Sequence, residues 1–309
     1  MASVRLYDIF NCKLDATQVL GAQEFEGGED YVVLSANTDG LPGMAARDRG
    51  PYSAMARLTC QDIEQWADLV ALWEASDSIS VEAAGKKAGT PIGTSYAKAT
   101  ASRMKLAAAS FAITQGNYGR ATFDMLNSAA AASDSPDDEI AVVDVASGSV
   151  THANKRRAVR VVGMSFDPNG AAGAIVAENL KALSVNLRLQ TARDYGDDDW
   201  GQVAETGGYE LTGSIEFGDV QLSSTQTIGQ ALLAADWGAL TVDYQQQGYG
   251  TGANLMQIAI QNCFFDSQRT RFLSRQFGRN VMAFGAFFQN GADAYNFSGA
   301  NQILTIAAA

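Results

Sequence analysis

Three short stretches recur in the same order in the two halves of this 309-residue chain, which predicts two copies of one structural unit. The matching pairs are Ala56–Ile63 with Gly213–Val220, Ile79–Val81 with Leu240–Val242, and Tyr118–Arg120 with Phe277–Arg279. Each pair alone is a weak match, but the three pairs have nearly the same separation. A duplicated unit of about 130–150 residues follows. The alternative is a chance recurrence of strand–helix–strand patterns in an α+β protein.

Each half is predicted to consist of strands around one helix. Apolar and polar residues alternate over Leu183–Gln190 and Tyr209–Phe217, which is typical of half-buried strands. An apolar stripe of Ile63, Trp66, Leu69, Val70 and Trp73 predicts a helix over 63–75, with Asp62 as its N-cap. A second helix is predicted over 225–235. Further strands are predicted at 4–10, 17–23, 55–60, 78–83, 99–113, 120–126, 140–145, 240–244, 255–265 and 281–288.

The predicted fold class is therefore mainly β with minor α, in two tandem β-sandwich or barrel domains that each carry one α-helix packed on the sheet. The boundaries are 1–127 for the first domain, 128–157 for a linker with a short hairpin, 158–290 for the second domain and 291–309 for a C-terminal arm. The end of this arm is too apolar for a free tail and should pair with this chain or with a neighbour. The candidates for contact between subunits are Gln302, Ile303, Leu304 and Ile306.

The composition excludes several kinds of function. The chain has 22 Lys and Arg against 34 Asp and Glu, a net charge of −12, which argues against a protein that coats nucleic acid through a basic face. A single histidine, His152, excludes metal sites built from several histidines. Three widely spaced cysteines indicate reduced thiols inside a cell. No segment reaches the ~18 apolar residues of a membrane span, and the first ten residues lack the apolar core of a signal peptide.

The short motifs predict no catalytic, cofactor-binding or metal site. Gly248, Gly250 and Gly252 lack the later glycine and helix of a phosphate loop. Ser95 and Lys98 have the spacing of a nucleophile motif whose two companion motifs are absent. The triplet 197–199 lacks the glycine and distal glutamate of a calcium loop. The chain is expected not to be an enzyme and to need no cofactor, although a hydrolase that uses two carboxylates stays open.

Acidic residues fall at matching places in the two halves, in what the pattern predicts to be hairpins between strands. Acidic hairpins are commonly just exposed to solvent, but a repeated ring would bring these clusters together. The candidate acidic residues are Glu24, Glu26, Glu29, Asp30, Asp194, Asp197, Asp198, Asp199 and Glu205.

The order of strand, acidic hairpin, strand, capped helix, strand, loop and long strand pair resembles the tail tube proteins of long-tailed bacteriophages. The stretch Leu211–Gln221 leading into Thr225–Ala235 is similar to that family, and Asp15–Gly21 is similar to its opening. The resemblance covers about 1–127 and 158–290 and lies in the order of patterns. Most members carry one tube domain and form hexameric rings, so this chain departs from them by its duplication.

The resemblance implies a structural virion protein in the duplicated tube-domain form. Homotrimeric rings with pseudo-sixfold symmetry would stack into a tail tube, joined at its ends by other tail proteins and placed in the virion tail. Double-stranded DNA would pass an acidic lumen without binding, because basic walls would hold phosphates. The alternatives are a baseplate hub or distal tail protein of the same fold, and a carbohydrate-binding β-sandwich with exposed Tyr195, Trp200 and Tyr209.

Overall fold

The computed structural model of the chain describes residues 7–36, 46–76, 78–87, 96–127, 140–145, 159–168, 175–178, 180–195, 202–217, 237–246, 254–271, 279–290 and 293–308. These residues form a 16-stranded antiparallel sheet with one helix, so the predicted class, mainly β with minor α, is confirmed. The helix predicted over 225–235 lies outside the described residues. Small elements complete the description: β2 (Thr17–Gln18), β10 (Ile175–Glu178), β16 (Gln289–Asn290) and β17 (Asp293–Ala294).

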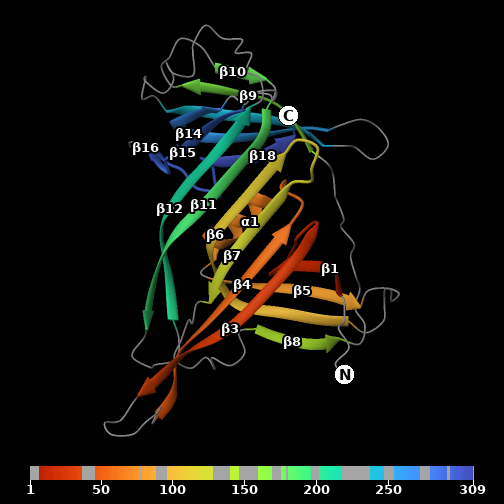
Figure 1. Cartoon of the computed structure of the whole chain (residues 1–309), viewed down its shortest axis with the longest axis vertical. Helices are drawn as coiled ribbons and strands as arrows, with labels where there is room; N and C mark the ends of the chain where they lie inside the picture. Colours follow the sequence, from red (N-terminus) through yellow and green to blue (C-terminus); the bar gives the residue numbers. More distant parts are fainter. Residues whose placement is uncertain are drawn as a thin grey trace.

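The strands of the first half form two parts of the large sheet, which share one long strand. The strands are β1 (Tyr7–Leu14), β3 (Ala22–Ala36), β4 (Ala46–Cys60), β5 (Ile79–Lys87), β6 (Tyr96–Thr114) and β7 (Arg120–Asn127). They pair in the order β3-β4-β7-β6-β5-β1. The start of β6 pairs with β5 and its end pairs with β7. Strand β6 therefore passes from the lower part of the sheet, which contains β5, into the long diagonal part, which contains β7 (Figure 1).

The second half repeats this strand order. Its strands are β9 (Val159–Pro168), β11 (Leu180–Tyr195), β12 (Gln202–Phe217), β13 (Gly238–Gln246), β14 (Asn254–Arg271) and β15 (Arg279–Ala286). They pair as β11-β12-β15-β14-β13-β9. Each half is followed by a short strand that returns to its long one, since β8 (Ile140–Val145) pairs with β6 and β18 (Leu304–Ala308) pairs with β14. We call residues 7–127 the first repeat and 159–290 the second repeat.

Irregularities in the strands fix which residues of the two repeats correspond. Arg103 in β6 and Asn262 in β14 both have a left-handed backbone, with φ of 52° and 49°. A bulge follows each, at Ala107 and at Asp266, so β6 and β14 correspond with a constant separation (262 − 103 = 266 − 107 = 159).

The other strand pairs carry bulges at corresponding places. Ala22 stands opposite Cys60, and Leu180 stands opposite Phe217, each just before a bulge in the first strand of the pair. The sequence match of 56–63 with 213–220 is therefore confirmed over 56–60 and 213–217, and residues 218–220 lie outside the described residues. The match of Ile79 with Leu240 is wrong by two residues, because Ile79 pairs with Met104 as Gly238 pairs with Cys263.

Helix α1 (Trp66–Ala75) buries the apolar stripe that the sequence predicted, from Ile63 to Trp73. Trp66 packs edge-on against Phe111 of β6, with ring centroids 5.0 Å apart. The N-cap prediction is wrong: Gln65 is the N-cap, and the Asp62 carboxylate accepts the backbone N–H of Glu64 at 3.0 Å instead. A turn in which the Trp66 N–H donates to the Ile63 carbonyl separates Asp62 from the helix, so its carboxylate lies too early to cap α1.

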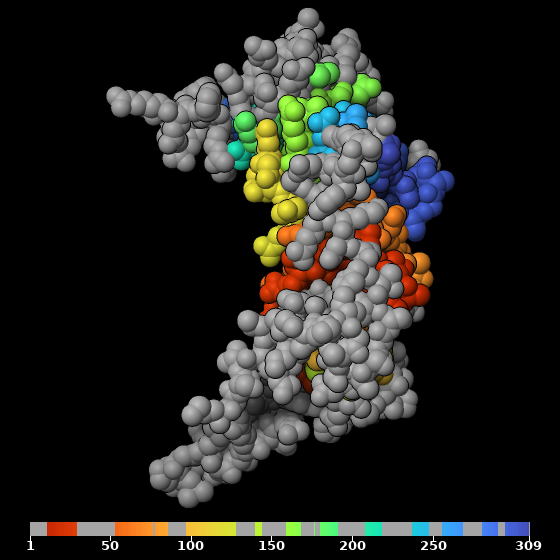
Figure 2. Space-filling model, turned by 90° about the vertical axis from the view of Figure 1, so that its right-hand side faces the viewer, coloured from red at the N-terminus to blue at the C-terminus, as the bar shows by residue number. Residues whose placement is uncertain are grey.

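The two repeats share one sheet and one core. Strand β11 of the second repeat pairs with the end of β6, and the buried apolar residues of both repeats form a single cluster. Figure 2 shows the two repeats in contact along the long axis of the molecule. The predicted boundaries at 127, 157 and 290 stay a prediction for independent domains, and Ile140–Val145 is the part of the predicted linker that the structure describes.

Candidate functional site

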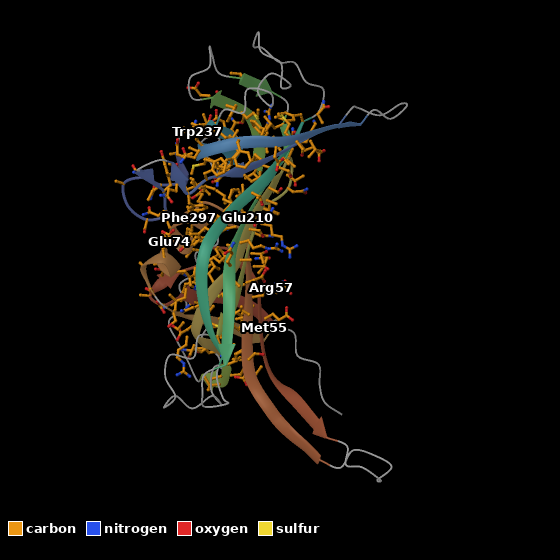
Figure 3. The ribbon with its side chains drawn as sticks, turned by 90° about the vertical axis from the view of Figure 1, so that its left-hand side faces the viewer. Met55, Arg57, Glu74, Glu210, Trp237 and Phe297 are labelled. Atoms are coloured by element: carbon orange, nitrogen blue, oxygen red, sulfur yellow. The ribbon has the colours of Figure 1, made fainter. Side chains whose placement is uncertain are left out.

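The largest candidate surface is one face of an eight-strand ladder that runs through both repeats. Its order is β3-β4-β7-β6-β11-β12-β15-β14. Side chains alternate along each strand, so Ala121, Phe123 and Met125 of β7 are buried toward the core. The opposite side, which we call the polar face, carries Arg57 and Met55, away from Glu74 and Phe297 (Figure 3).

Charges of both signs form a row across the polar face. Glu26 stands opposite Arg57, which stands opposite Asp124. Across β6, Arg188 stands opposite Ala108 on one side and Glu210 on the other. Residues directly opposite share a face, so the row alternates in sign along neighbouring strands.

Arg57 and Asp124 form an ion pair at the centre of this row. The hydrogen bond to Asp124 raises the pKa of Arg57, and the charge of Asp124 and then of Glu26 and Glu24 adds to this effect. The two side chains are 53% and 40% exposed. Water therefore screens the pair, and its contribution to stability is below about 1 kcal/mol.

The structure places the predicted acidic residues of the first repeat inside a strand, and not in a loop between strands. Hydrogen bonds to β4 continue through Glu24–Asp30, because β3 runs on to Ala36. Alternation puts Glu24 and Glu26 on the polar face and Glu29 on the other, where its carboxylate accepts the backbone N–H of Ile140 at 2.8 Å. The first-repeat cluster is therefore split between two faces.

The acidic residues of the second repeat are described only by their backbone. Asp194 lies at the end of β11, and Glu205 lies in β12 opposite Ala192. Asp197, Asp198 and Asp199 lie outside the described residues, as do Trp200 and His152. The prediction that both clusters face one lumen stays a prediction.

The apolar end of the chain pairs with its own chain, which is one of the two outcomes expected from the sequence. Ile306 stands opposite Ile258 in the β18–β14 pair, and the side chains of Ile303 and Leu304 are fully buried. Gln302 donates its side-chain N–H to the carbonyl of Phe297 at 3.3 Å. Contact of these four residues with another subunit stays a prediction.

A contact that the sequence did not predict joins α1 to residues near the C-terminus. The Glu74 carboxylate accepts the backbone N–H groups of Phe297 at 2.9 Å and Ser298 at 3.0 Å, and the Ser298 hydroxyl at 3.1 Å. Phe297 is buried against Trp66, with ring centroids 5.7 Å apart. These residues are 223 positions apart, and no local pattern links them.

Tyr209 is exposed at 37%, as the sequence predicted. Its ring lies 5.2 Å from that of Phe288, and burial followed by the charge of Glu74 raises the pKa of its hydroxyl. The adjoining cavity, lined by Trp73, Glu74, Lys105 and Tyr209 among others, holds only about 150 Å³. A cavity of this size is smaller than the usual small-molecule site of about 300–1,000 Å³.

The three cysteines are buried and separate. Burial, followed by the nearby Asp62, raises the pKa of the Cys60 thiol to about 12, and burial also raises those of Cys12 and Cys263. Such thiols are poor nucleophiles and ligands. Lys98 of the serine–lysine motif forms an ion pair with Glu82, and Ser95 and Gly248–Gly252 lie outside the described residues.

Metal sites and membrane-spanning helices are two further features that bear on function. In that part of the chain, no group of three or more His, Cys, Asp or Glu side chains is placed to hold a metal ion. There, too, no helix is long and apolar enough to cross a membrane.

Both ends of the eight-strand ladder have open backbone edges in the described part of the chain. Strand β3 pairs there only with β4. After Cys263, β14 pairs only with β15, since β13 and β18 pair with its earlier residues. Unpaired N–H and C=O groups along such edges are a template for another strand.

A scan against models of protein families gives no match to this chain, and a search of curated proteins finds no relative.

Proposed function

We propose that this chain is a structural protein that associates edge to edge into rings, which stack into a hollow tube for the passage of double-stranded DNA, as in a bacteriophage tail. The observation that carries the proposal is the side-by-side junction of two like repeats. The β6–β11 pair joins them, and the ladder ends in the open edges of β3 and β14. Since two like repeats are joined by strand pairing within one chain, further chains can be added through the same kind of pairing between their open edges.

Association between two different edges supports a ring. Such head-to-tail contacts form a closed ring where the rotation closes, and a filament where it does not. Closing a sheet into a barrel removes every open edge. Three chains, which give six repeats, are the copy number implied by the resemblance to duplicated tube proteins.

The dimensions of such a barrel suit the proposed cargo. Each chain contributes eight strands to the ladder. With strands about 4.8 Å apart and tilted by about 40°, three chains give a barrel about 50 Å across between backbones. After side chains are added, this leaves room for a B-DNA duplex about 20 Å wide.

The polar face is the surface that we assign to the lumen, because α1 and the core cover the other side of the ladder. Glu24 and Glu26 would supply acidic groups to this lining beside the ion pair of Arg57 with Asp124, and the small residues Ser184 and Ser214 would supply a neutral part. Repulsion of phosphates reaches about 8 Å at physiological salt. That range is enough to keep DNA off the wall without slowing its passage.

Negative-stain microscopy and sedimentation of the purified chain at rising concentration test this function. We expect closed trimeric rings that stack into tubes at the highest concentrations. Rings that never stack would favour the hub or distal tail protein. A chain that stays monomeric at high concentration would contradict the proposal.

A further inference from the structure

We infer that β3 of one chain pairs antiparallel with the end of β14 of a second copy, in the register that puts Glu26 opposite Arg271 and Gly28 opposite Arg269. This inference rests on the proposed self-association and specifies its interface. It follows from the way in which the chain joins its own two repeats.

The open segment of β3 corresponds to the segment of β11 that makes the internal junction. In β3, residues Glu24–Asp30 lie between two bulges, and in β11 residues Ala182–Arg188 lie between the corresponding two. The internal junction uses Ala182–Arg188 of β11. Glu24–Asp30 is therefore the same edge on the first repeat, and among the described strands β3 forms a ladder only with β4.

The open end of β14 corresponds to the end of β6 on the other side of that junction. Residues Ala108–Thr114 of β6 pair with β11 directly after the bulge at Ala107. The corresponding bulge of β14 is at Asp266, so Ser267–Arg271 matches Ala108–Ala112. This segment pairs with β15 on one side, as the end of β6 pairs with β7.

Transfer of the internal register to these two edges gives the pairs between chains. The internal pairs are Ser184 with Ala112, Val185 with Phe111, Asn186 with Ser110, Leu187 with Ala109 and Arg188 with Ala108. The corresponding pairs between chains are Glu26 with Arg271, Gly27 with Thr270, Gly28 with Arg269, Glu29 with Gln268, and Asp30 with Ser267.

The charges of the two edges are complementary in this register. The β3 segment Glu24–Asp30 contains four acidic residues and no basic one, and Ser267–Arg271 contains two arginines and no acid. Opposite charges that face each other across strands stabilise a pair, and like charges oppose it. The internal junction has the uncharged residues Ser184 and Ala112 at the positions that match Glu26 and Arg271, so the charge of that pair is specific to the two open ends.

The two edges are accessible for such a pairing. Glu24, Glu26 and Ser267 are exposed. A Cβ added at Gly28 would meet nothing within 4 Å, so the space above the polar face is open at this position. The two edges of one chain cannot pair with each other, because they lie at opposite ends of an eight-strand ladder about 34 Å wide.

Paired cysteines test the register. The double variant Glu26→Cys/Arg271→Cys places two thiols opposite each other, with Cα atoms about 4.5–5.5 Å apart, which suits a disulfide. On air oxidation we expect dimers and trimers on a non-reducing gel, with trimer as the limit. The three native cysteines are buried and should give no background.

The matched control is Glu26→Cys/Thr270→Cys, because a shift of one residue moves the second thiol to the other face of the sheet. Equal or better cross-linking in this control would overturn the register. Rings in the microscope without cross-linking of the first variant would overturn this interface but leave the proposed function standing. A chain that neither cross-links nor assembles would contradict both.

Charge reversal gives a second, reversible test. Glu26→Lys alone and Arg271→Glu alone should each weaken association at least 5-fold at low salt. The double variant Glu26→Lys/Arg271→Glu should restore it, since the opposite charges face each other again. Double-variant association as weak as that of the single variants would count against the pairing, and far-ultraviolet circular dichroism would show whether each variant is folded.

Discussion

The two repeats have the same strand order but fill one place in their cores differently. Gly213 of β12 lies against Phe284 of β15, and a Cβ at this glycine would lie 2.3 Å from the Phe284 ring and 2.4 Å from the Ser184 carbonyl oxygen. The corresponding residues of the first repeat are Ala56 and Met125, which face each other across β4 and β7. Between the repeats, glycine replaces alanine where phenylalanine replaces methionine. The fold therefore requires that this volume be filled but does not require one particular pair of side chains.

The polar faces of the repeats differ more than their cores do. The first repeat has Glu26, Arg57 and Asp124 in one row. The corresponding row of the second repeat is Ser184, Ser214 and Ala283, in which the two hydroxyls are hydrogen-bonded at 2.8 Å. Since the same strands form with and without the charges, this fold does not depend on them, and their placement is available for another role.

The largest effect is expected from giving the second repeat the small residue of the first. Gly213→Ala should lower the free energy of unfolding by about 3 kcal/mol, because the new methyl group meets a backbone oxygen as well as a ring. Chemical denaturation followed by circular dichroism measures the change. The reciprocal control Ala56→Gly should cost only about 1 kcal/mol.

Adding Phe284→Met to Gly213→Ala recreates the pair of the first repeat and should recover part of the loss. The double variant removes the ring from the new methyl group, although the Ser184 carbonyl stays close. A double variant less stable than Gly213→Ala alone would show that the two repeats are not interchangeable at this place.

The buried thiols, two in the first repeat and Cys263 in the second, should make the folded chain sensitive to alkali. Cys12 and Cys60 belong to the first repeat, and the corresponding residues Met164 and Phe217 cannot ionise. A pKa raised in the folded state keeps the proton on the native thiol, so this stability is complete below about pH 9 and is lost as the pH rises toward 12.

We expect the free energy of unfolding to fall over that range, and Cys60→Ala to show a shallower fall than the wild type. Thiol labelling at pH 8 should be slow in the native chain and fast in denaturant. Rapid labelling of the native chain would show that these thiols are accessible.

The contact that joins α1 to residues near the C-terminus should have an intermediate effect. Glu74→Gln keeps the shape but removes the charge that accepts three hydrogen bonds from Phe297 and Ser298, and should cost about 1–2 kcal/mol. Asp68→Asn, an exposed change on the same helix, is the matched control and should be nearly neutral. Equal losses in the two variants would assign the effect to the charge of the helix.

The smallest effect is expected from converting the polar row of the first repeat into that of the second. Arg57→Ser/Asp124→Ala should change the free energy of unfolding by less than about 1 kcal/mol, because both side chains are largely exposed. Thermal unfolding at low and high salt measures it. A loss of several kcal/mol would mean that the charges support the fold after all.

Strand positions and the first helix could be predicted because their signals are local. Ile140–Val145 has the predicted bounds, and the stripe from Ile63 to Trp73 is buried as expected. The strand predicted over 17–23 was ended too early, because β3 continues through the polar residues Glu24–Asp30. An edge strand can form without alternating apolar and polar residues, so its sequence gives a weaker signal. The offset of Ile79 was misjudged because the bulges that fix the alignment are not visible in a short apolar match.

The site was harder to predict than the fold. The acidic residues Glu24 and Glu29 were grouped by closeness in sequence, yet alternation puts them on opposite faces. The contact of Glu74 with Phe297 joins residues from opposite ends of the chain, and only the folded topology brings them together. The open edges of β3 and β14 likewise depend on which strands pair, and the pairing of strands cannot be predicted from composition.

The contact of Glu74 with Phe297 also has a consequence for synthesis of the chain on the ribosome. The two residues are 223 positions apart, so at about 5–20 residues per second the helix waits about 10–45 s for its partner to be made. Until then the Trp66 ring lacks part of its cover, and the core of the first repeat is incomplete. A nascent chain that has emerged only as far as β3 and β4 therefore displays one open edge long before β14 exists, which delays association until β14 has been made.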